Sequence, residues 1–142
     1  MKSLMKMNNF FVIDTNNLIS ASLIPTSTSR KALEKAMNLG KIAIAPNTQD
    51  ELLDVIFRKK LDKYFSDNNE RLVIVNILEA NAVFFSPEIS IDECKDKKDN
   101  KFLELAIAAQ ASCIITGDND LLVLHSFRNI PILNAFNFIN TF

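Results

Sequence analysis

Four acidic residues stand where the sequence predicts that helices begin, and their side chains carry the oxygen atoms that hard metal ions bind. They are Asp14, Glu51, Asp99 and Asp118. Carboxylates within a few ångström repel one another, and removing them together from water is unfavourable unless a cation lies between them. A ligand set made only of oxygen suits Mg²⁺ or Mn²⁺ and argues against zinc.

The elements that would position these acids are short apolar strands that alternate with helices. Runs of apolar and β-branched residues predict strands at 10–13, 42–45, 82–85, 113–116 and 131–133. Helices are expected directly after Asp14 and over 30–39, 48–57, 72–78, 100–111 and 118–124. This alternation predicts an α/β fold, a three-layer α/β/α sandwich with a mostly parallel central sheet of about five strands.

The acids follow these elements in a regular way. Asp14 comes directly after the first predicted strand, and Asp118 follows the fourth. Asp99 opens the helix at 100–111, while Glu51 lies in the first turn of the helix after the second strand. Because parallel strands end at one edge of a sheet, where ligands bind, we expect all four carboxylates to gather there.

Each acid taken singly has a simpler explanation as a helix-capping residue. Asp14, Asp99 and Asp118 are suitable N-caps, and Glu51 has capping-box spacing from Thr48. A cap does not exclude a metal ligand, since one carboxylate has several acceptor positions. Four acids at one sheet edge therefore favour a metal site over four independent caps.

The composition excludes several other kinds of site. One His and two Cys are too few for zinc-finger spacing, a disulfide framework or a Cys–His nucleophile pair. Two Gly cannot form a P-loop or a dinucleotide-binding fingerprint, and a net charge of -1 excludes a histone-like binder. The free cysteines, with no export signal and no membrane span, predict a cytoplasmic protein. We expect one domain, residues 1–142, in which 1–8 form a loose N-terminal extension.

Four motifs in register resemble those of the PIN-domain family, in the branch that contains toxins of prokaryotic toxin–antitoxin pairs. The matching segments are FVIDTN at 11–16, TQDELL at 48–53 followed by RKKL at 58–61, DKKDNKFLELA at 96–106, and ITGDNDLL at 115–122. With their spacing they cover nearly the whole chain, as far as the apolar segment around Phe138. The resemblance implies an α/β/α sandwich related to flap endonucleases and a ribonuclease that depends on Mg²⁺ or Mn²⁺.

Carried over by position, the resemblance also implies roles for individual residues. The catalytic and metal-binding acids are Asp14, Glu51, Asp99 and Asp118, with Asp120 as a further metal ligand and Asn16 and Thr116 as supporting polar neighbours. Asp96 and Asp99 both precede the fourth strand, and either could be the third ligand. Asp99 is preferred because it lies at the start of the helix.

The implied reaction is endonucleolytic hydrolysis of RNA phosphodiester bonds by a metal-activated water. No side chain is a convincing general base, because the single His, His125, lies late in the helix at 118–124, where it suits a surface or helix-dipole role. The family further implies a cognate antitoxin over the acidic edge, and homodimers are common in it. No membrane partner is expected.

Basic residues flank the acids along the chain. The candidates for contacts with RNA phosphates are Arg58, Lys59, Lys60, Lys98 and Lys101. A solvated charged face is the commoner meaning of such runs, but their position beside the acids favours phosphate binding equally. The preference for RNA comes from the resemblance alone, and single strands suit an open groove.

Other classes of protein gather acids at a sheet edge but need residues that this chain lacks. A receiver domain would need a phosphorylated Asp after the third strand and a Lys after the fifth, where the sequence has Ser86 and Asn134. A haloacid-dehalogenase-type phosphatase would need a second Asp two residues after Asp14, and Asn16 stands there. The serious alternative is a catalytically silent PIN-like domain that binds RNA or a partner protein.

Overall fold

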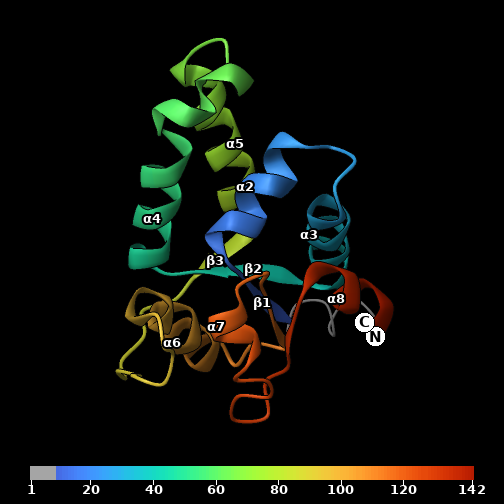
Figure 1. The fold of residues 1–142 in the computed structure, drawn as a ribbon, viewed down its shortest axis with the longest axis vertical. Coiled ribbons are helices and arrows are strands. Elements are labelled where there is room, and N and C mark those ends of the chain that lie inside the picture. The colour runs from blue at the N-terminus through green and yellow to red at the C-terminus, as the bar shows by residue number, and fades with distance from the viewer. Residues whose placement is uncertain (1–8) are drawn as a thin grey trace.

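The computed structural model describes residues 9–142, so the N-terminal extension predicted at residues 1–8 lies outside the described residues. The elements are β1 (Phe10–Ile13), α2 (Thr15–Leu23), α3 (Thr28–Leu39), β2 (Lys41–Ile44), α4 (Pro46–Ile56), η1 (Lys59–Tyr64), α5 (Asn68–Ala80), β3 (Ala82–Phe84), η2 (Lys97–Asp99), α6 (Asn100–Ala109), β4 (Cys113–Ile115), α7 (Asn119–Leu122), β5 (Ile132–Leu133) and α8 (Ala135–Thr141). Figure 1 shows the sheet between two groups of helices. Within the described range, no helix combines the length and the apolar character needed to cross a membrane.

The central sheet has five strands in the order β3-β2-β1-β4-β5, and every pair of neighbours is parallel. β1 is the middle strand, where Phe11 pairs with Cys113 and Ile13 with Ile115 of β4. The chain leaves β1 toward β2 on one side, while β4 lies on the other. The carboxyl ends of β1 and β4 therefore form the topological switch point at which such sheets bind ligands.

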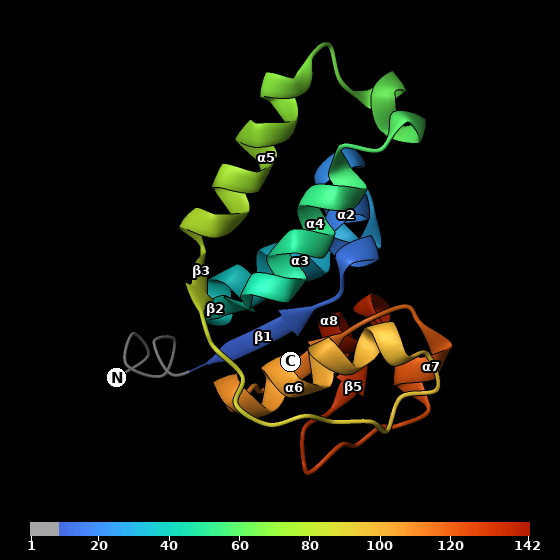
Figure 2. The same cartoon turned by 90° about the vertical axis from the view of Figure 1, so that its left-hand side faces the viewer.

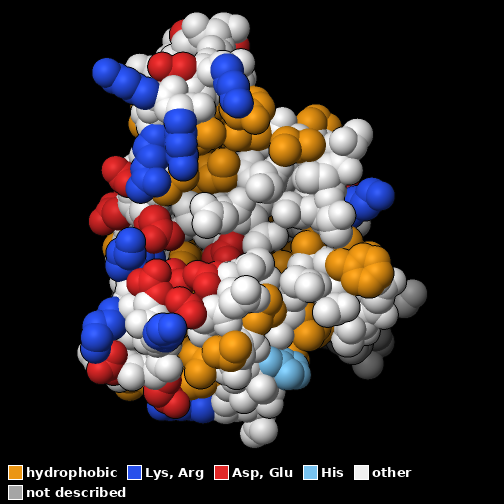
Figure 3. All heavy atoms as spheres, viewed as in Figure 1, with side chains coloured by type: hydrophobic (Ala, Val, Ile, Leu, Met, Phe, Trp, Pro, Cys, Tyr) orange, Lys and Arg blue, Asp and Glu red, His pale blue; other side chains and the backbone are white. Residues whose placement is uncertain are grey.

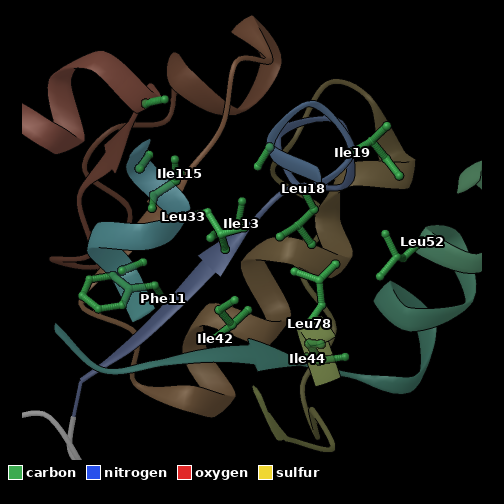
Figure 4. Close-up of a cluster of buried hydrophobic side chains, with 14 of the residues drawn as sticks. Phe11, Ile13, Leu18, Ile19, Leu33, Ile42, Ile44, Leu52, Leu78 and Ile115 are labelled. Atoms are coloured by element: carbon green, nitrogen blue, oxygen red, sulfur yellow. The ribbon is translucent and has the colours of Figure 1, made fainter. Parts of the chain in front are cut away.

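Side chains of the strands alternate between two hydrophobic cores. Phe11 and Ile13 point into the core formed with α2, α3, α4, α5 and α8, which Figure 4 shows in close-up. Val12 points into the other core, formed with α6 and α7. Figure 2 shows α2 to α5 on one side of β1 and α6 with α7 on the other. Helices cover both faces of the central strands β1 and β4, which are apolar throughout, and the predicted α/β/α sandwich is confirmed.

The helix after β2 begins two residues earlier than the sequence predicts, which changes the role of Glu51. α4 begins at Pro46, whose missing N–H is no loss in a first helical turn. The hydroxyl of Thr48 accepts a hydrogen bond from the N–H of Ala45 (3.0 Å) and donates one to its carbonyl (3.1 Å). The predicted capping box of Thr48 and Glu51 is therefore wrong. The side chain of Glu51 binds Thr15 and Lys101 instead.

The C-terminal third contains two further differences from the prediction. The helix predicted at 118–124 is the single turn α7, so His125 lies beyond it. Its Nδ1 accepts a hydrogen bond from the N–H of Ile132 (2.9 Å), so the residue joins the loop to β5 and does not act at a helix end. The sequence predicts no helix at α8, yet Phe138 on this helix is fully buried while Phe136 is exposed. One face of the apolar C-terminal segment thus completes the first core.

Arg71 of α5 joins this helix to η1 in the projecting part of the molecule seen at the top of Figure 2. Its side chain is 6% exposed, its guanidinium pairs with Asp62, and it lies 4.7 Å from the centre of the Phe65 ring. We expect Arg71→Ala to lower the free energy of unfolding by about 2 kcal/mol, because it removes the ion pair, the ring contact and the packed stem.

Urea unfolding measures this effect. Arg71→Met keeps the apolar stem and should recover part of the loss, whereas Lys60→Ala removes an exposed cation from η1 and should change little. An Arg71→Ala protein as stable as Lys60→Ala would show that the buried guanidinium does not hold η1 to α5.

Candidate metal centre

Asp14 and Asp118 meet at the switch point and are joined through the hydroxyl of Thr116. Oδ1 of Asp14 accepts hydrogen bonds from the N–H (2.9 Å) and Nδ2 (3.0 Å) of Asn17, and Oδ2 accepts one from Thr116. The same Thr116 oxygen accepts the N–H of Asp118 at 3.0 Å. Asp14 is 6% exposed and Thr116 0%, so a buried hydroxyl sets the spacing of the two acids. Asp14 is both an N-cap and a member of the acidic edge.

Asp99 lies at the N-cap position of α6, but its side chain makes no capping hydrogen bond. One carboxylate oxygen from each of Asp96, Asp99 and Asp118 lies within 4.8 Å of the other two. Oδ2 of Asp99 is buried and has no hydrogen-bond partner in the described part of the chain. A buried, unpaired carboxylate oxygen beside two other carboxylates fits a divalent cation. The structure brings the carboxylates of Asp96 and Asp99 close together. The position of one therefore does not exclude the other as a metal ligand.

The protonation of Asp99 reflects the same crowding. Burial, then its hydrogen bond with Asp118, then the negative charges of Asp118, Asp96 and Glu51 raise the pKa of Asp99 to about 7. The hydrogen bond from Asp99 lowers the pKa of Asp118. Asp99 therefore keeps its proton to a higher pH than an isolated carboxyl does, as one member of a carboxylate pair does in a shared site.

Glu51 faces these acids from α4, and both of its oxygens are held. Oε2 accepts a hydrogen bond from the hydroxyl of Thr15, and Oε1 lies 2.8 Å from Nζ of Lys101. The side chains of Lys101 and Glu51 are only 17% and 26% exposed. Lys101, predicted as a contact for RNA phosphate, is thus an internal counter-ion of the acidic edge.

The loop that carries Asp96 and Asp99 is held by Asn100, which is 6% exposed. Its Oδ1 accepts hydrogen bonds from the N–H groups of Cys94 (2.8 Å) and Glu93 (3.2 Å).

Burial raises the pKa of the Cys94 thiol, and it raises that of Cys113 to about 12. Both thiols are buried.

These residues surround a cavity of about 200 Å³, which we call the acidic cavity. Its lining residues are Asp14, Thr15, Asn16, Glu51, Val55, Arg58, Asp96, Lys98, Asp99, Phe102 and Asp118. Figure 3 shows the acidic side chains gathered on this face, with most of the Lys and Arg side chains above them and to their left. His125, in pale blue, lies apart from the acids on the lower right.

The other predicted site residues divide between this cavity and its surroundings. Arg58 and Lys98 line the cavity, although Arg58 also pairs with Asp54 at 2.9 Å. Lys59 and Lys60 are exposed on η1 and do not line it. Asp120 does not line it either: its backbone N–H donates to Oδ1 of Asp118 (2.9 Å).

Sequence reasoning missed three polar residues that organise the site. Thr15, which follows Asp14, donates a hydrogen bond to Glu51, and Asn17 donates to Asp14. Asn100, which follows Asp99, accepts a hydrogen bond from the backbone of the loop that carries Asp99. Each lies within three residues of a predicted acid, and this proximity was the one signal that could have found them. Glu51, the partner of Thr15, is remote in sequence, and Asn100 binds backbone groups, so residue types alone do not reveal either contact.

Residues 11–120 match the family model described as PIN domain. The match covers most of the chain, so this chain belongs to the PIN-domain family, whose members are generally nucleases. The predicted family is thereby confirmed. In sequence, the chain is 33% identical over 129 residues to the uncharacterized protein MJ1680 of Methanocaldococcus jannaschii, a match that covers 87% of this chain and 80% of that protein.

Two crystal structures share the fold at 14% sequence identity. One is VapBC2 from Rickettsia felis bound to a DNA fragment from its promoter, with a TM-score of 0.60 over 88% of this chain and 98% of that chain. The other is PAE2754 from Pyrobaculum aerophilum, with a TM-score of 0.62 over 96% of this chain and 91% of that chain.

Proposed function

We propose that this chain is a metal-dependent endoribonuclease that hydrolyses phosphodiester bonds at the acidic cavity. The observation that carries the proposal is the group of three carboxylates from Asp96, Asp99 and Asp118. Oδ2 of Asp99 is buried and has no hydrogen-bond partner among the described residues. Membership of the PIN-domain family supports nuclease chemistry at this edge.

The donor set favours Mg²⁺ or Mn²⁺ as the cofactor, because all of the candidate ligands are oxygens. Asp96, Asp99 and Asp118 would hold the ion, with Asp14 and Glu51 on the walls of the same cavity. When bound, such an ion lowers the pKa of a coordinated water and neutralises charge that develops on the leaving oxygen. Asp120 stays a proposed further ligand, although it does not line the cavity.

The chain's own residues hold the acids in place before substrate arrives. Thr116 fixes Asp14 relative to Asp118, while Thr15 and Lys101 together orient Glu51. Such preorganisation is the protein's principal contribution to phosphoryl hydrolysis, because little side-chain reorganisation is then required during the reaction. Asn16 also lines the cavity, and its proposed role is to contact the substrate backbone.

The substrate proposed is single-stranded RNA, and the family resemblance supports that choice over DNA. Lys98 and Arg58 line the cavity beside the acids and offer positive charge to the flanking phosphates. Lys59 and Lys60 lie on the adjacent segment η1, where they can extend this contact along a longer strand.

We further propose that the protein is the toxin of a toxin–antitoxin pair and has a cognate antitoxin as its partner. The fold that it shares with VapBC2 supports this assignment. A homodimer is proposed on the family resemblance alone, and a cytoplasmic location on the two free cysteines.

The test is cleavage of an end-labelled, mixed-sequence single-stranded RNA with Mn²⁺, Mg²⁺ or EDTA, next to a DNA strand of the same sequence. Cleavage of the RNA that EDTA abolishes is the expected result. RNA that is bound in the presence of Mn²⁺ but never cleaved would overturn the proposal in favour of a catalytically silent PIN-like binder.

A charge substitution tests the proposed path of the phosphates. The double variant Arg58→Ala/Lys98→Ala is expected to raise the KM for RNA about tenfold with little change in kcat, because these cations bind phosphate before and during the reaction alike. The dependence of binding on salt should also weaken, by about one unit of slope for each phosphate that is no longer bound by a cation. Lys31→Ala, which removes an exposed cation from α3, is the matched control. An unchanged salt dependence in the double variant would contradict the assignment.

A further inference from the structure

A second cavity, of about 380 Å³, opens beside the acidic cavity. Asn16, Asn17 and Ser20 of α2, Ser29 of α3 and Gly117 after β4 form its walls, and we call it the amide–hydroxyl pocket. Its size falls within the roughly 300–1,000 Å³ of small-molecule sites. Its side chains offer hydrogen-bond donors and acceptors, and within the described residues no Lys or Arg lines it.

The two cavities share Asp14, Asn16 and Asp118, so the acids stand between them. Arg58 and Lys98 lie on the acidic-cavity side only. In Figure 3 the surface to the right of the acids is largely uncharged, in contrast to the blue side chains on the left. A phosphate at the acids has a nucleoside on either side, and one of these nucleosides would then lie toward each cavity.

Two polar residues of this pocket, Asn17 and Ser29, are held by side-chain hydrogen bonds. The Nδ2 of Asn17 donates to Oδ1 of Asp14 (3.0 Å), and its Oδ1 accepts the hydroxyl of Ser29 (3.0 Å). Asn17 thus connects the pocket wall to an acid of the metal centre. Asn17, Ser20 and Ser29 are all partly exposed, so hydrophobic packing does not account for them.

Gly117 keeps this pocket open. The backbone does not require glycine there, because no glycine among the described residues has a positive φ. A Cβ at this position would meet Nδ2 of Asn17 at 3.8 Å, which is an ordinary contact distance. A side chain would therefore fit the backbone but would project toward Asn17 and occupy the pocket.

We propose that the amide–hydroxyl pocket binds the ribonucleoside next to the scissile phosphate. The inference rests on the proposed ribonuclease function and adds the place where the substrate is recognised. Ribose hydroxyls and base edges need neutral donors and acceptors, which amides and hydroxyls supply. A phosphate is disfavoured there, because no Lys or Arg of residues 9–142 lines the pocket and two carboxylates adjoin it. Ser29 and Gly117 are the specificity-determining residues, since neither belongs to the acidic cavity.

The experiment compares wild type with Ser29→Ala and Gly117→Val on a mixed-sequence RNA with Mn²⁺, mapping every cleavage position. Filling the pocket with Val is expected to lower kcat/KM about tenfold, and removing the Ser29 hydroxyl about fivefold, with cleavage positions redistributed among nucleotides. The increase in melting temperature that Mn²⁺ produces should be unchanged in both. A purely structural role would lower the rate equally at every position.

The outcomes separate this inference from the function beneath it. A wild type that neither binds nor cleaves RNA removes the ribonuclease proposal, and the pocket assignment with it. A wild type that cleaves, beside variants with the same positions and the same kcat/KM, overturns the pocket assignment alone. Should Gly117→Val not fold, Ser29→Ala decides the question by itself.

Discussion

Replacing Asp14 with Asn is expected to reduce kcat/KM for RNA cleavage by at least roughly 10²-fold while the protein stays folded. Asn has the shape of Asp, and its oxygen can still accept the N–H of Asn17 that caps α2. The substitution removes a negative charge from a position 6% exposed, between the two cavities. The effect therefore falls on the chemistry of the site rather than on helix formation.

Asp67→Asn is the matched control, because Asp67 is also an N-cap whose carboxylate accepts a backbone N–H, that of Glu70, on α5. Both variants should show nearly wild-type circular dichroism and melting temperature. Single-turnover cleavage with Mn²⁺ then separates them, with loss of activity for Asp14→Asn alone. Equal activity in the two variants would reduce Asp14 to a helix cap.

Asp99→Asn is expected to make the metal-free protein more stable at about pH 8 and to abolish its stabilisation by Mn²⁺. The carboxyl of Asp99 has its pKa raised to about 7 from 3.8. Between those values the folded protein retains a proton that the unfolded chain has released, so the free energy of unfolding falls as the pH rises through this window. Asn stays neutral, and the variant should lose that decline.

The neighbouring shift has the opposite sign and acts at lower pH. The pKa of Asp118 is lowered, so its contribution to stability is present above its ordinary pKa and is lost as the pH falls through the folded value. Above about pH 4 the Asp99 effect therefore dominates the pH dependence.

Thermal unfolding in EDTA and in Mn²⁺ measures both expectations. In EDTA at about pH 8, Asp99→Asn should melt about 3 °C or more above wild type. Wild type should gain about 2.7 kcal/mol at a Mn²⁺ concentration of 100 times its Kd, and the variant should gain much less. Asp50→Asn, which removes an exposed carboxylate from α4, should behave as wild type in both solutions. A variant that Mn²⁺ stabilises as much as wild type would exclude Asp99 as a ligand.

The strands and the acids that follow them were predictable because their signals are local. Short runs of apolar and β-branched residues, typical of strands covered on both faces, predict β1 and β4. Asp14 and Asp118 directly follow or lie close after these strands, at the switch point. The predicted start of α4 is wrong because Pro46 can end a strand and can equally occupy the first helical position, which is the one it takes.

What could not be predicted depends on contacts between remote segments. The hydrogen bond between Thr15 and Glu51 and the ion pair between Glu51 and Lys101 join residues of three different helices, α2, α4 and α6. The sequence makes Asp96 and Asp99 alternatives for one ligand, yet the η2 turn brings both carboxylates toward Asp118. The C-terminal helix α8 does have helical spacing, with Ala135, Phe138 and Ile139 on the packed side and Asn137, Asn140 and Thr141 exposed. With 7 residues it is too short for this pattern to distinguish a helix from a loop, and its burial follows from packing against α3 and the sheet.

The pairing of Lys101 with Glu51, together with the proton held by Asp99, has a consequence for the order of events after synthesis. Both features offset negative charge at the acidic edge without any ion from solution. We therefore expect a newly made chain to reach its native fold in a metal-poor medium and to remain folded without the metal. Under the proposed function, the supply of metal would then decide when the protein becomes active, whereas folding itself would not require the metal. For a ribonuclease of the kind proposed here, folding and activation would be separate steps.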